Sequence, residues 1–283
     1  MNKLITIIAF LLPFQSAIGQ NTILWKVTDT INGKISMVVG TFHQYGNSFV
    51  DSIPEIQDAL LQSELAIFES IDDSDSATKI INSRTQTNQI SKHLKRKDFE
   101  KLKIISKNWK VNLYKLKPIE LRWKLHQVFV ETKCKTVKAS DEWDHFDNYL
   151  IHKAKKNQIE IYGLESDSLQ LSLIEEEYDY PEWKKEKKII GYWIKKVMSK
   201  KLAKTDCSLA KKYRNFDLDY SFSEDCADDI ILNKRNEDWM KTIPNFLETK
   251  NCFIAVGLFH LYKKCGLIQQ LKSFGFKVEP IKI

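Results

Sequence analysis

The sequence predicts an α/β protein, in which a mixed β-sheet is flanked by helices and a helical insertion or cap occupies the middle of the chain. Phe253–Val256 is apolar at every position, as in a strand that is covered on both faces. Two further apolar runs, Met37–Val39 and Leu65–Phe68, have the same character, and helical patterns separate the three runs. The composition, with 43% hydrophobic and 29% charged residues, is that of an ordinary globular protein.

The start of the chain has the features of a secretory signal peptide. Lys3 gives a positive charge, Leu4–Phe14 is an apolar run, and Ala17 and Gly19 are small residues at the positions that a signal peptidase reads. The run is too short for a transmembrane helix, which needs about 20 apolar residues. We therefore expect residues 1–19 to be cleaved and residues 20–283 to form a single α/β domain, exported to the periplasm or secreted, with no transmembrane helix after signal removal. An uncleaved anchor is the alternative.

The mature chain begins with a predicted β-hairpin. Ile23–Val27 and Ile35–Val39 flank an Asn-Gly pair at 32–33, the commonest sequence in a two-residue hairpin turn. A helix over Ser52–Ser63 and a short buried strand over Leu65–Glu69 follow. Strand, helix and strand in this order form a crossover unit, so we expect the second hairpin strand and the strand at 65–69 to run parallel.

The middle of the chain is mainly helical in pattern. Asp72–Asn88 is rich in polar residues and is predicted to be a mobile or lid-like loop. The elements expected after it are helices at Lys97–Trp109, Pro118–Thr132 and Asp144–Asn157, a strand at Ile159–Glu165, a helical stretch at Ser166–Arg214 interrupted at Tyr180-Pro181, a helix at about Ser223–Glu248, the strand at Phe253–Val256, a helix at Gly266–Phe274 and a strand at Lys277–Ile281. We expect the cap to comprise about residues 90–215.

Charge and cysteine content narrow the possible functions. The net charge is +7, and the excess lysines lie mainly in Lys184–Lys212. Because the chain is expected to be exported and has no nucleic-acid-binding motif, we expect no nucleic-acid partner and interpret this stretch as a solvent-exposed helix face. The five cysteines include no CxxC pair. One or two disulfides are expected, and the loop placement of Cys207 and Cys226 suggests that these two residues pair.

Four polar side chains follow predicted buried strands: His43, Glu69, Glu165 and His260. Both histidines stand three residues after a glycine that ends an apolar run. Since ligands in α/β sheets bind outside the carboxyl ends of the strands, parallel strands would bring all four side chains to one edge. Two imidazoles and two carboxylates can bind a divalent metal and activate water, or can act without metal through a general base. Alternatively, the two glutamates are surface residues or partners of lysines.

The other histidines, His93, His126, His145 and His152, follow no predicted strand, and we expect structural or solvent-exposed roles for them. A serine or cysteine nucleophile is not supported, because the chain has no GxSxG turn and no cysteine next to a histidine. A glycine-rich phosphate-binding loop is also missing from the sequence.

The same residues resemble the TraB/GumN family. The N-terminal signature is similar at Leu24–Val27, Val39–His43 and Ala66–Glu69, the central element at Tyr162–Glu165 with Gln170, and the C-terminal half at Arg235-Asn236, Trp239, Val256–Leu261, Gly266-Leu267 and Gly275–Pro280. These segments span essentially the whole mature chain in the family's order. The family is similar to Tiki-type metalloproteases and shares a fold with erythromycin esterases and haem-binding ChaN-like proteins, so an erythromycin-esterase/ChaN-like fold is implied.

The resemblance also implies roles for individual residues. His43, His260 and Glu69 would bind a divalent metal, manganese or cobalt by preference and zinc or iron otherwise. Glu69 would act as a ligand or general base, and Glu165 and Arg235 would complete the catalytic group by orienting or stabilising the substrate. Arg235 is the natural candidate to meet the oxyanion that forms when water adds to a carbonyl.

The sequence departs from the family pattern around the second histidine. The family has a small residue before this histidine and a glycine soon after it, whereas Phe259 and Tyr262-Lys263-Lys264 occupy these places here. The bulk is expected to narrow the cleft. The two lysines are expected to favour an acidic or carboxylate-bearing substrate.

The leading hypothesis is an exported metal-dependent hydrolase, specifically a peptidase, that acts on a peptide or a small molecule. The alternative is a non-catalytic protein that binds a peptide or haem in the same cleft. Metal-free ester hydrolysis by histidine and glutamate is a third possibility.

Overall fold

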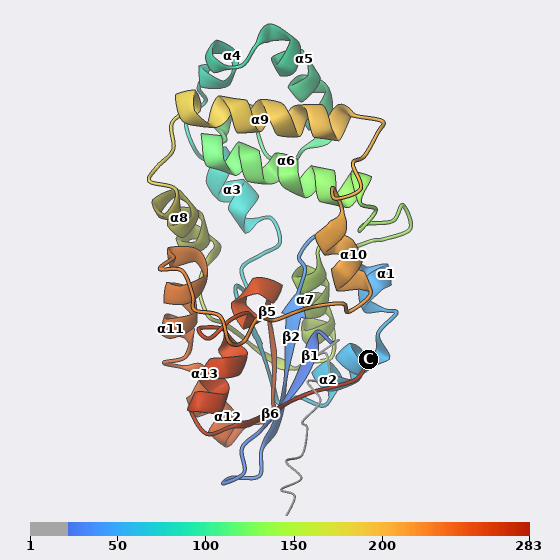
Figure 1. Ribbon diagram of the computed structural model, residues 1–283, viewed down its shortest axis with the longest axis vertical. Helices are drawn as coiled ribbons and strands as arrows, with labels where there is room; N and C mark the ends of the chain where they lie inside the picture. Colours follow the sequence, from blue (N-terminus) through green and yellow to red (C-terminus); the bar gives the residue numbers. More distant parts are fainter. Residues whose placement is uncertain (1–21) are drawn as a thin grey trace, which may run out of the picture.

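A six-stranded mixed β-sheet forms the centre of the protein, and a layer of helices lies beyond one end of it (Figure 1). The computed structural model describes residues 22–283, so the expected signal peptide at residues 1–19 lies outside the described residues. Among residues 22–283, every helix is too short or too polar to cross a lipid bilayer.

The strand order is β4-β3-β5-β2-β1-β6. The strands are β1 (Leu24–Thr28), β2 (Ile35–Thr41), β3 (Leu65–Phe68), β4 (Glu160–Gly163), β5 (Cys252–Gly257) and β6 (Lys277–Pro280). The four strands β4, β3, β5 and β2 are parallel to one another, and β1 is antiparallel to both β2 and β6. This arrangement confirms the predicted α/β class with a mixed sheet. The second hairpin strand and β3 do run parallel, but β5 lies between them.

The predicted hairpin is present with a longer loop than the Asn-Gly pair suggests. Thr28 pairs with Ile35, so residues 29–34 form the connection. The carboxylate of Asp29 accepts hydrogen bonds from the backbone N–H groups of Ile31 and Asn32. This side chain organises the loop, because it offers the backbone an alternative to continued strand pairing.

Helices cover both faces of the sheet, as predicted. On one side lie α1 (Asn47–Val50), α2 (Pro54–Leu61) and α7 (Phe146–Lys156), which contact one another. On the other lie α12 (Ile243–Thr249) and α13 (Leu267–Ser273), which Figure 1 shows in front of the sheet. The chain crosses the sheet in one direction from β2 to β4 and in the opposite direction from β4 to β5. Right-handed crossovers place the helices of these two parts on opposite faces of the sheet, in agreement with this distribution.

The helices beyond the sheet form a cap with a core of its own. The cap comprises α3 (Ser76–Asn82), α4 (Gln89–His93), α5 (Arg96–Ile105), η1 (Ser106–Asn108), η2 (Leu113–Lys115), α6 (Pro118–Lys133), α8 (Asp167–Glu177) and α9 (Trp183–Met198). Leu121 and Leu125 of α6 pack with Ile190 and Ile194 of α9 in this core. Only part of the stretch 90–215, for which a cap is expected, belongs to the cap. Between the two cap segments the chain returns to the sheet and forms α7 and β4.

Two local predictions are wrong. The lid-like loop at 72–88 contains α3, because Ile81 is buried in the cap core and the side chain of Asn82 bonds to the backbone of Lys110 and Asn112. The single helix expected at about 223–248 is instead a π-helical turn, η3 (Ile230–Lys234), followed by α11 (Arg235–Trp239) and the separate helix α12. Pro244 lies in the first turn of α12, where proline is tolerated but cannot continue a preceding helix.

The expected disulfide between Cys207 and Cys226 is also wrong. Cys207, just before α10 (Ser208–Arg214), pairs with Cys134, which follows α6. Cys226 pairs with Cys265, which follows the second histidine turn. Cys252 is the remaining cysteine and is buried in β5. The pairing depends on which loops the fold brings together, and sequence spacing does not report this.

Candidate active site at the carboxyl edge of the sheet

His43, Glu69, Glu165 and His260 all lie at one edge of the sheet. Each follows one of the four parallel strands within three residues of its last residue: His43 follows β2, Glu69 follows β3, Glu165 follows β4, and His260 lies in η4 (Leu258–Leu261) after β5. The strand ends are in register, with Thr41 opposite Gly257 and Phe68 opposite Ala255. The predicted convergence of the four side chains is therefore confirmed.

The glycines of the two GxxH turns let the turns approach closely. A Cβ atom on Gly40 would lie 2.8 Å from a methyl group of Leu261, in the turn that carries His260. A Cβ atom on Gly257 would lie 3.1 Å from both Nε2 of His43 and Oε1 of Glu69. Each glycine thus makes room for the other motif, because a side chain at either position would separate the two histidine turns.

Asp147 fixes the orientation of His43. Its Oδ2 atom lies 2.6 Å from Nδ1 of His43, and its Oδ1 atom accepts a 2.8 Å hydrogen bond from the hydroxyl of Thr41. The backbone N–H of Phe146, at the start of α7, also donates to the carbonyl oxygen of His43. With Nδ1 donating to the carboxylate, the Nε2 atom of His43 is directed toward Gly257 and Glu69.

Asn236 fixes the tautomer of His260. The Nδ2 atom of Asn236 donates to the carbonyl oxygens of His260 and Cys265, at 3.0 Å in each case. Its Oδ1 atom must therefore be the acceptor in the 2.7 Å contact with Nδ1 of His260. The proton of the neutral imidazole is on Nδ1, which leaves a lone pair on Nε2.

A buried arginine joins the two glutamates to His260. Arg235 Nη2 donates to Oε2 of Glu69 at 2.6 Å and also to Glu165, and its Nε donates to Oε2 of Glu165 at 3.1 Å. Its Nη1 lies 3.1 Å from Nε2 of His260. The guanidinium is thus a fixed positive charge between two carboxylates and an imidazole lone pair. Trp239, which packs against His260, donates its indole N–H to Glu165 as well.

These contacts set distinct protonation states. Burial lowers the pKa of His260 to about 3, with the Arg235 charge acting in the same direction, so His260 is neutral. Burial also lowers the pKa of His43, but the neighbouring Asp147 and Glu69 carboxylates outweigh it and raise the pKa to about 9. For Glu69, burial raises the pKa, whereas the nearby imidazole and guanidinium groups and the Gly257 amide hold it well below its usual range.

Within residues 22–283, His43, His145 and Asp147 form a group of possible metal ligands: each offers one ligand atom, and these atoms all lie within 4.8 Å of one another. The two imidazole rings are stacked, with centroids 5.2 Å apart. Burial lowers the pKa of His145 to about 4, so this imidazole is neutral and able to act as a ligand. This cluster could hold a metal ion on the side of His43 that faces Asp147.

The expected ligand set of His43, Glu69 and His260 lies on the opposite side of the same imidazole. Nε2 of His260 is 3.7 Å from Oε1 of Glu69, and both Glu69 and His43 line the space that a side chain at Gly257 would fill. Both imidazoles use Nδ1 for a hydrogen bond, which is the usual arrangement for a histidine that binds a metal through Nε2. His43, Glu69 and His260 offer imidazole and carboxylate groups, which are ligand types that divalent cations accept, but Arg235 Nη1 occupies the position next to Nε2 of His260.

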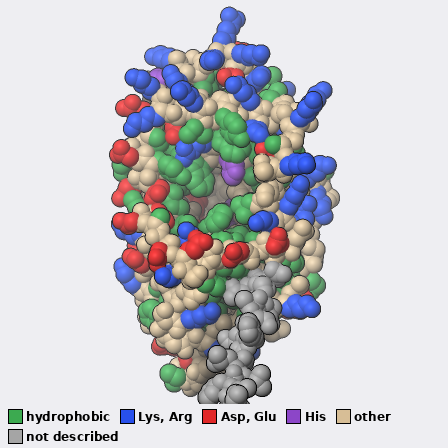
Figure 2. Space-filling view, in the orientation of Figure 1, with side chains coloured by type: hydrophobic (Ala, Val, Ile, Leu, Met, Phe, Trp, Pro, Cys, Tyr) green, Lys and Arg blue, Asp and Glu red, His purple; other side chains and the backbone are tan. Residues whose placement is uncertain are grey.

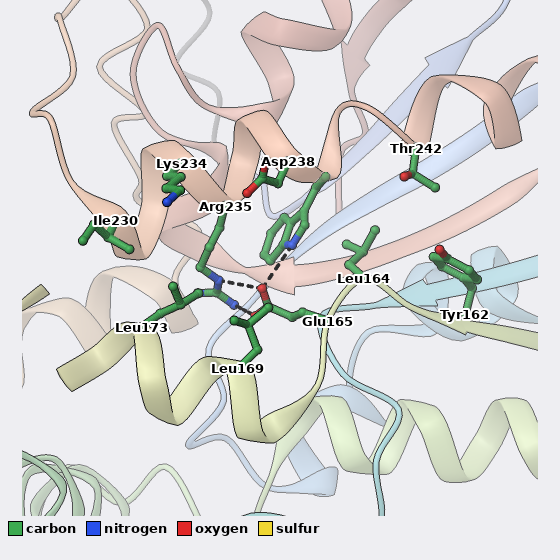
Figure 3. A pocket seen from close by; sticks show the side chains of 11 residues that line it. Tyr162, Leu164, Glu165, Leu169, Leu173, Ile230, Lys234, Arg235, Asp238 and Thr242 are labelled. Atoms are coloured by element: carbon green, nitrogen blue, oxygen red, sulfur yellow. Dashed lines mark hydrogen bonds and ion pairs between the residues drawn. The ribbon is translucent and has the colours of Figure 1, made fainter. Parts of the chain in front are cut away.

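A pocket of about 200 Å³ adjoins the Arg235–Glu165 ion pair between α8 and α11 (Figure 3). Figure 3 shows Arg235 reaching from α11 to Glu165, with Leu169 and Leu173 of α8 beside the pair. Most of the other lining side chains are apolar. The pocket gives the outer side of the guanidinium a path to solvent, although only 10% of the arginine side chain is exposed.

The face of the molecule in Figure 2 is hollowed between the cap and the sheet, and apolar side chains and a histidine line the hollow.

Two residues that depart from the family pattern lie near the second histidine. Lys263 pairs with Glu224 and Lys264 with Asp225, at 3.4 Å and 2.7 Å. The positive charge on which the expected preference for an acidic substrate depends is therefore largely compensated by neighbouring carboxylates.

Sequence reasoning missed His145 and Asp147. A structural or solvent-exposed role is expected for His145 because no predicted strand precedes it, and Asp147 lies inside the helix predicted at residues 144–157, where no pattern marks it as a site residue. A topological signal was present, because a helix that leads into a parallel strand begins at the edge where the other strands end. α7 leads into β4 in this way, so its first turn belongs to the same edge as His43.

Comparison with known proteins identifies one family. A sequence model of the TraB/PrgY/gumN family matches residues 23–280, which confirms the resemblance inferred from the motifs. In a comparison with curated protein sequences, none matches the chain.

Proposed function

The chain belongs to the TraB/PrgY/gumN family, and on this basis we propose that it is a metal-dependent hydrolase that cleaves peptide bonds. The observation that carries the proposal is the position of Glu69, which meets His43 beside Gly257 and lies 3.7 Å from Nε2 of His260, with Arg235 next to both Glu69 and His260. Two oriented imidazoles, an ionised carboxylate and a fixed cation in one cleft suit the addition of water to a carbonyl.

We assign the metal to the Nε2 side of His43, where His43, Glu69 and His260 would hold it. A divalent cation at this place supplies Lewis-acid chemistry, because it polarises a carbonyl group and makes water more acidic. Manganese or cobalt is our first choice, and zinc or iron also suits imidazole and carboxylate ligands. The cluster of His43, His145 and Asp147 is the rival position, and variants of His145 and His260 distinguish the two.

The chain's own residues divide the remaining work. Asn236 keeps His260 in the tautomer that directs an Nε2 lone pair into the cleft, and Asp147 orients His43 so that its Nε2 also faces the cleft. Because the pKa of His43 is about 9, its Nε2 must release a proton when a metal binds. Glu69 remains ionised, and we propose it either as the carboxylate ligand of the metal or as the general base that accepts a proton from water. Arg235 carries a permanent charge and, once released from His260, is placed to donate to the oxyanion that develops on the carbonyl oxygen.

Glu165 stays paired with Arg235 when the arginine moves away from His260. Its carboxylate bonds to both Nε and Nη2 of the guanidinium, whereas His260 contacts only Nη1. Arg235 can therefore leave the imidazole and stay paired with Glu165. A paired arginine costs much less to keep in a buried site than an unpaired one, so Glu165 acts as a positioning residue.

Cleavage of a peptide library by the purified mature protein, with and without Mn²⁺ or Co²⁺, tests the proposal. We expect metal-dependent cleavage that is lost on chelation and in the Glu69→Gln variant. Activity that survives EDTA would instead indicate metal-free hydrolysis by histidine and glutamate. A protein that binds peptides or haem and cleaves nothing with either metal would be a binding protein. Export, which we propose from residues 1–19, is tested separately by locating the processed protein.

A further inference from the structure

Helix α9 carries an unusual concentration of positive charge on the outside of the cap. The segment from Lys184 to Lys204 contains nine lysines and one glutamate, a net charge of +8, whereas the whole chain has a net charge of +7. The rest of the protein is therefore close to neutral. Figure 2 shows Lys and Arg side chains crowded over the cap end of the molecule.

Among the described residues, only one of these nine lysines, Lys196, forms an ion pair. Five lysines of α9 form no ion pair with any described residue, and all five are exposed to solvent: Lys184, Lys185, Lys187, Lys188 and Lys195. The ion pairs of this helix use its other charged residues, Glu186 with Arg122 and Lys196 with Asp206. Unpaired lysines at this density repel one another, so the surface favours an anionic partner.

Large apolar side chains are exposed among the lysines. Ile189, Tyr192 and Met198 are 40%, 49% and 40% exposed, respectively. Lys184, Lys188, Tyr192 and Lys195 follow spacings of three or four residues and so share one face of the helix. The opposite face is buried in the cap core through Ile190 and Ile194, which holds the basic and apolar face outward.

We propose that the outer face of α9 binds the surface of an anionic lipid bilayer. Lysines attract the negatively charged headgroups, and the aliphatic and aromatic side chains enter the boundary between headgroups and acyl chains. A polyanion such as nucleic acid fits less well, because the segment contains no arginine to form paired hydrogen bonds with phosphates and because exposed Ile and Met gain nothing from such a partner. This inference does not depend on the proposed hydrolase activity.

Flotation of the mature protein with lipid vesicles tests the proposal. We expect binding to vesicles of phosphatidylcholine mixed with phosphatidylglycerol, little binding to phosphatidylcholine alone, and release at high salt. Combining Lys184→Gln, Lys188→Gln and Lys195→Gln should weaken binding at least tenfold. Combining Ile189→Gln with Tyr192→Gln should also weaken it while leaving the net charge unchanged.

A matched control removes three exposed lysines elsewhere, by Lys155→Gln, Lys156→Gln and Lys282→Gln. Binding as tight as that of the unmodified protein is expected for this variant. An equal loss in the control would overturn the proposal, because only net charge would then matter. Binding to DNA or to an acidic polysaccharide without binding to the mixed vesicles would also overturn it. Circular dichroism of each variant establishes that the cap remains folded.

Discussion

Gly257 lies beside the imidazole of His43, so that a Cβ atom on the glycine would stand 3.1 Å from the Nε2 atom of the histidine. The glycine belongs to one GxxH turn and the histidine to the other. The two motifs therefore form a single site in which the glycine of each turn clears space for the other turn. The glycine at this position serves proximity rather than backbone conformation, because its φ of −54° is open to any residue.

The Gly257→Ala variant tests this relationship. The added methyl group would press against His43 and Glu69, and neither can retreat far while Asp147 and Arg235 hold it. We expect metal affinity and kcat/KM to fall at least tenfold, with a loss of stability of about 1–3 kcal/mol from overpacking. Isothermal titration with Mn²⁺ and thermal unfolding measure the two effects. Unchanged metal affinity in a folded variant would show that the space is not part of a metal site.

The pairing of His43 with Asp147 predicts how the stability of the metal-free protein depends on pH. The pKa of His43 is raised from 6.5 to about 9 in the folded protein. Its contribution to the free energy of unfolding is therefore complete below pH 6.5 and is lost as the pH rises toward 9. Because 36% of the side chain is exposed, water screens the pair, and we expect a loss of roughly 1 kcal/mol.

Thermal unfolding in EDTA across this pH range makes the measurement. The Asp147→Asn variant should start from a lower stability and show a flatter profile, because the charge that raises the pKa of His43 is removed. An identical slope in the two proteins would mean that the pair does not control the titration.

Arg235→Lys separates the charge of the arginine from its geometry. A lysine keeps one positive charge but cannot bond to Glu165, Glu69 and an oxyanion at once. We expect kcat to fall by about 10²–10³, as for the loss of an oxyanion donor, with a smaller change in KM and unchanged metal content. Lys234→Ala, at the exposed preceding position, is the control and should retain full activity. Equal activity of the two variants would remove Arg235 from the catalytic group.

The strand-end residues were predictable because a local pattern fixes their place in the fold. An apolar strand followed by a glycine and a histidine puts His43 and His260 at the carboxyl edge of a sheet, and parallel strands share that edge. The same reasoning reached Glu69 and Glu165. The family match confirms the resemblance and the mixed sheet confirms the fold class, whereas an erythromycin-esterase/ChaN-like class stays a prediction.

The partners of those residues were harder to predict because they are distant in sequence. Asp147 contacts His43 across 104 residues, and no pattern around it distinguishes a carboxylate that orients a histidine from a helix cap. The predicted disulfide pairing was wrong for the same reason, since Cys134 and Cys207 meet only when the cap folds back onto α10. Helix α3 was missed because its polar sequence is stabilised by tertiary contacts, which override weak local preference.

We propose that His43, Glu69 and His260 hold a divalent metal on the Nε2 side of His43. The test is elemental analysis of the protein and of its His260→Ala and His145→Ala variants, each loaded with Mn²⁺ and freed of excess metal. We predict one metal ion per chain in the unmodified protein and in His145→Ala, and none in a folded His260→Ala. Full metal content in His260→Ala would contradict the claim, and its loss in His145→Ala alone would place the metal beside Asp147 instead.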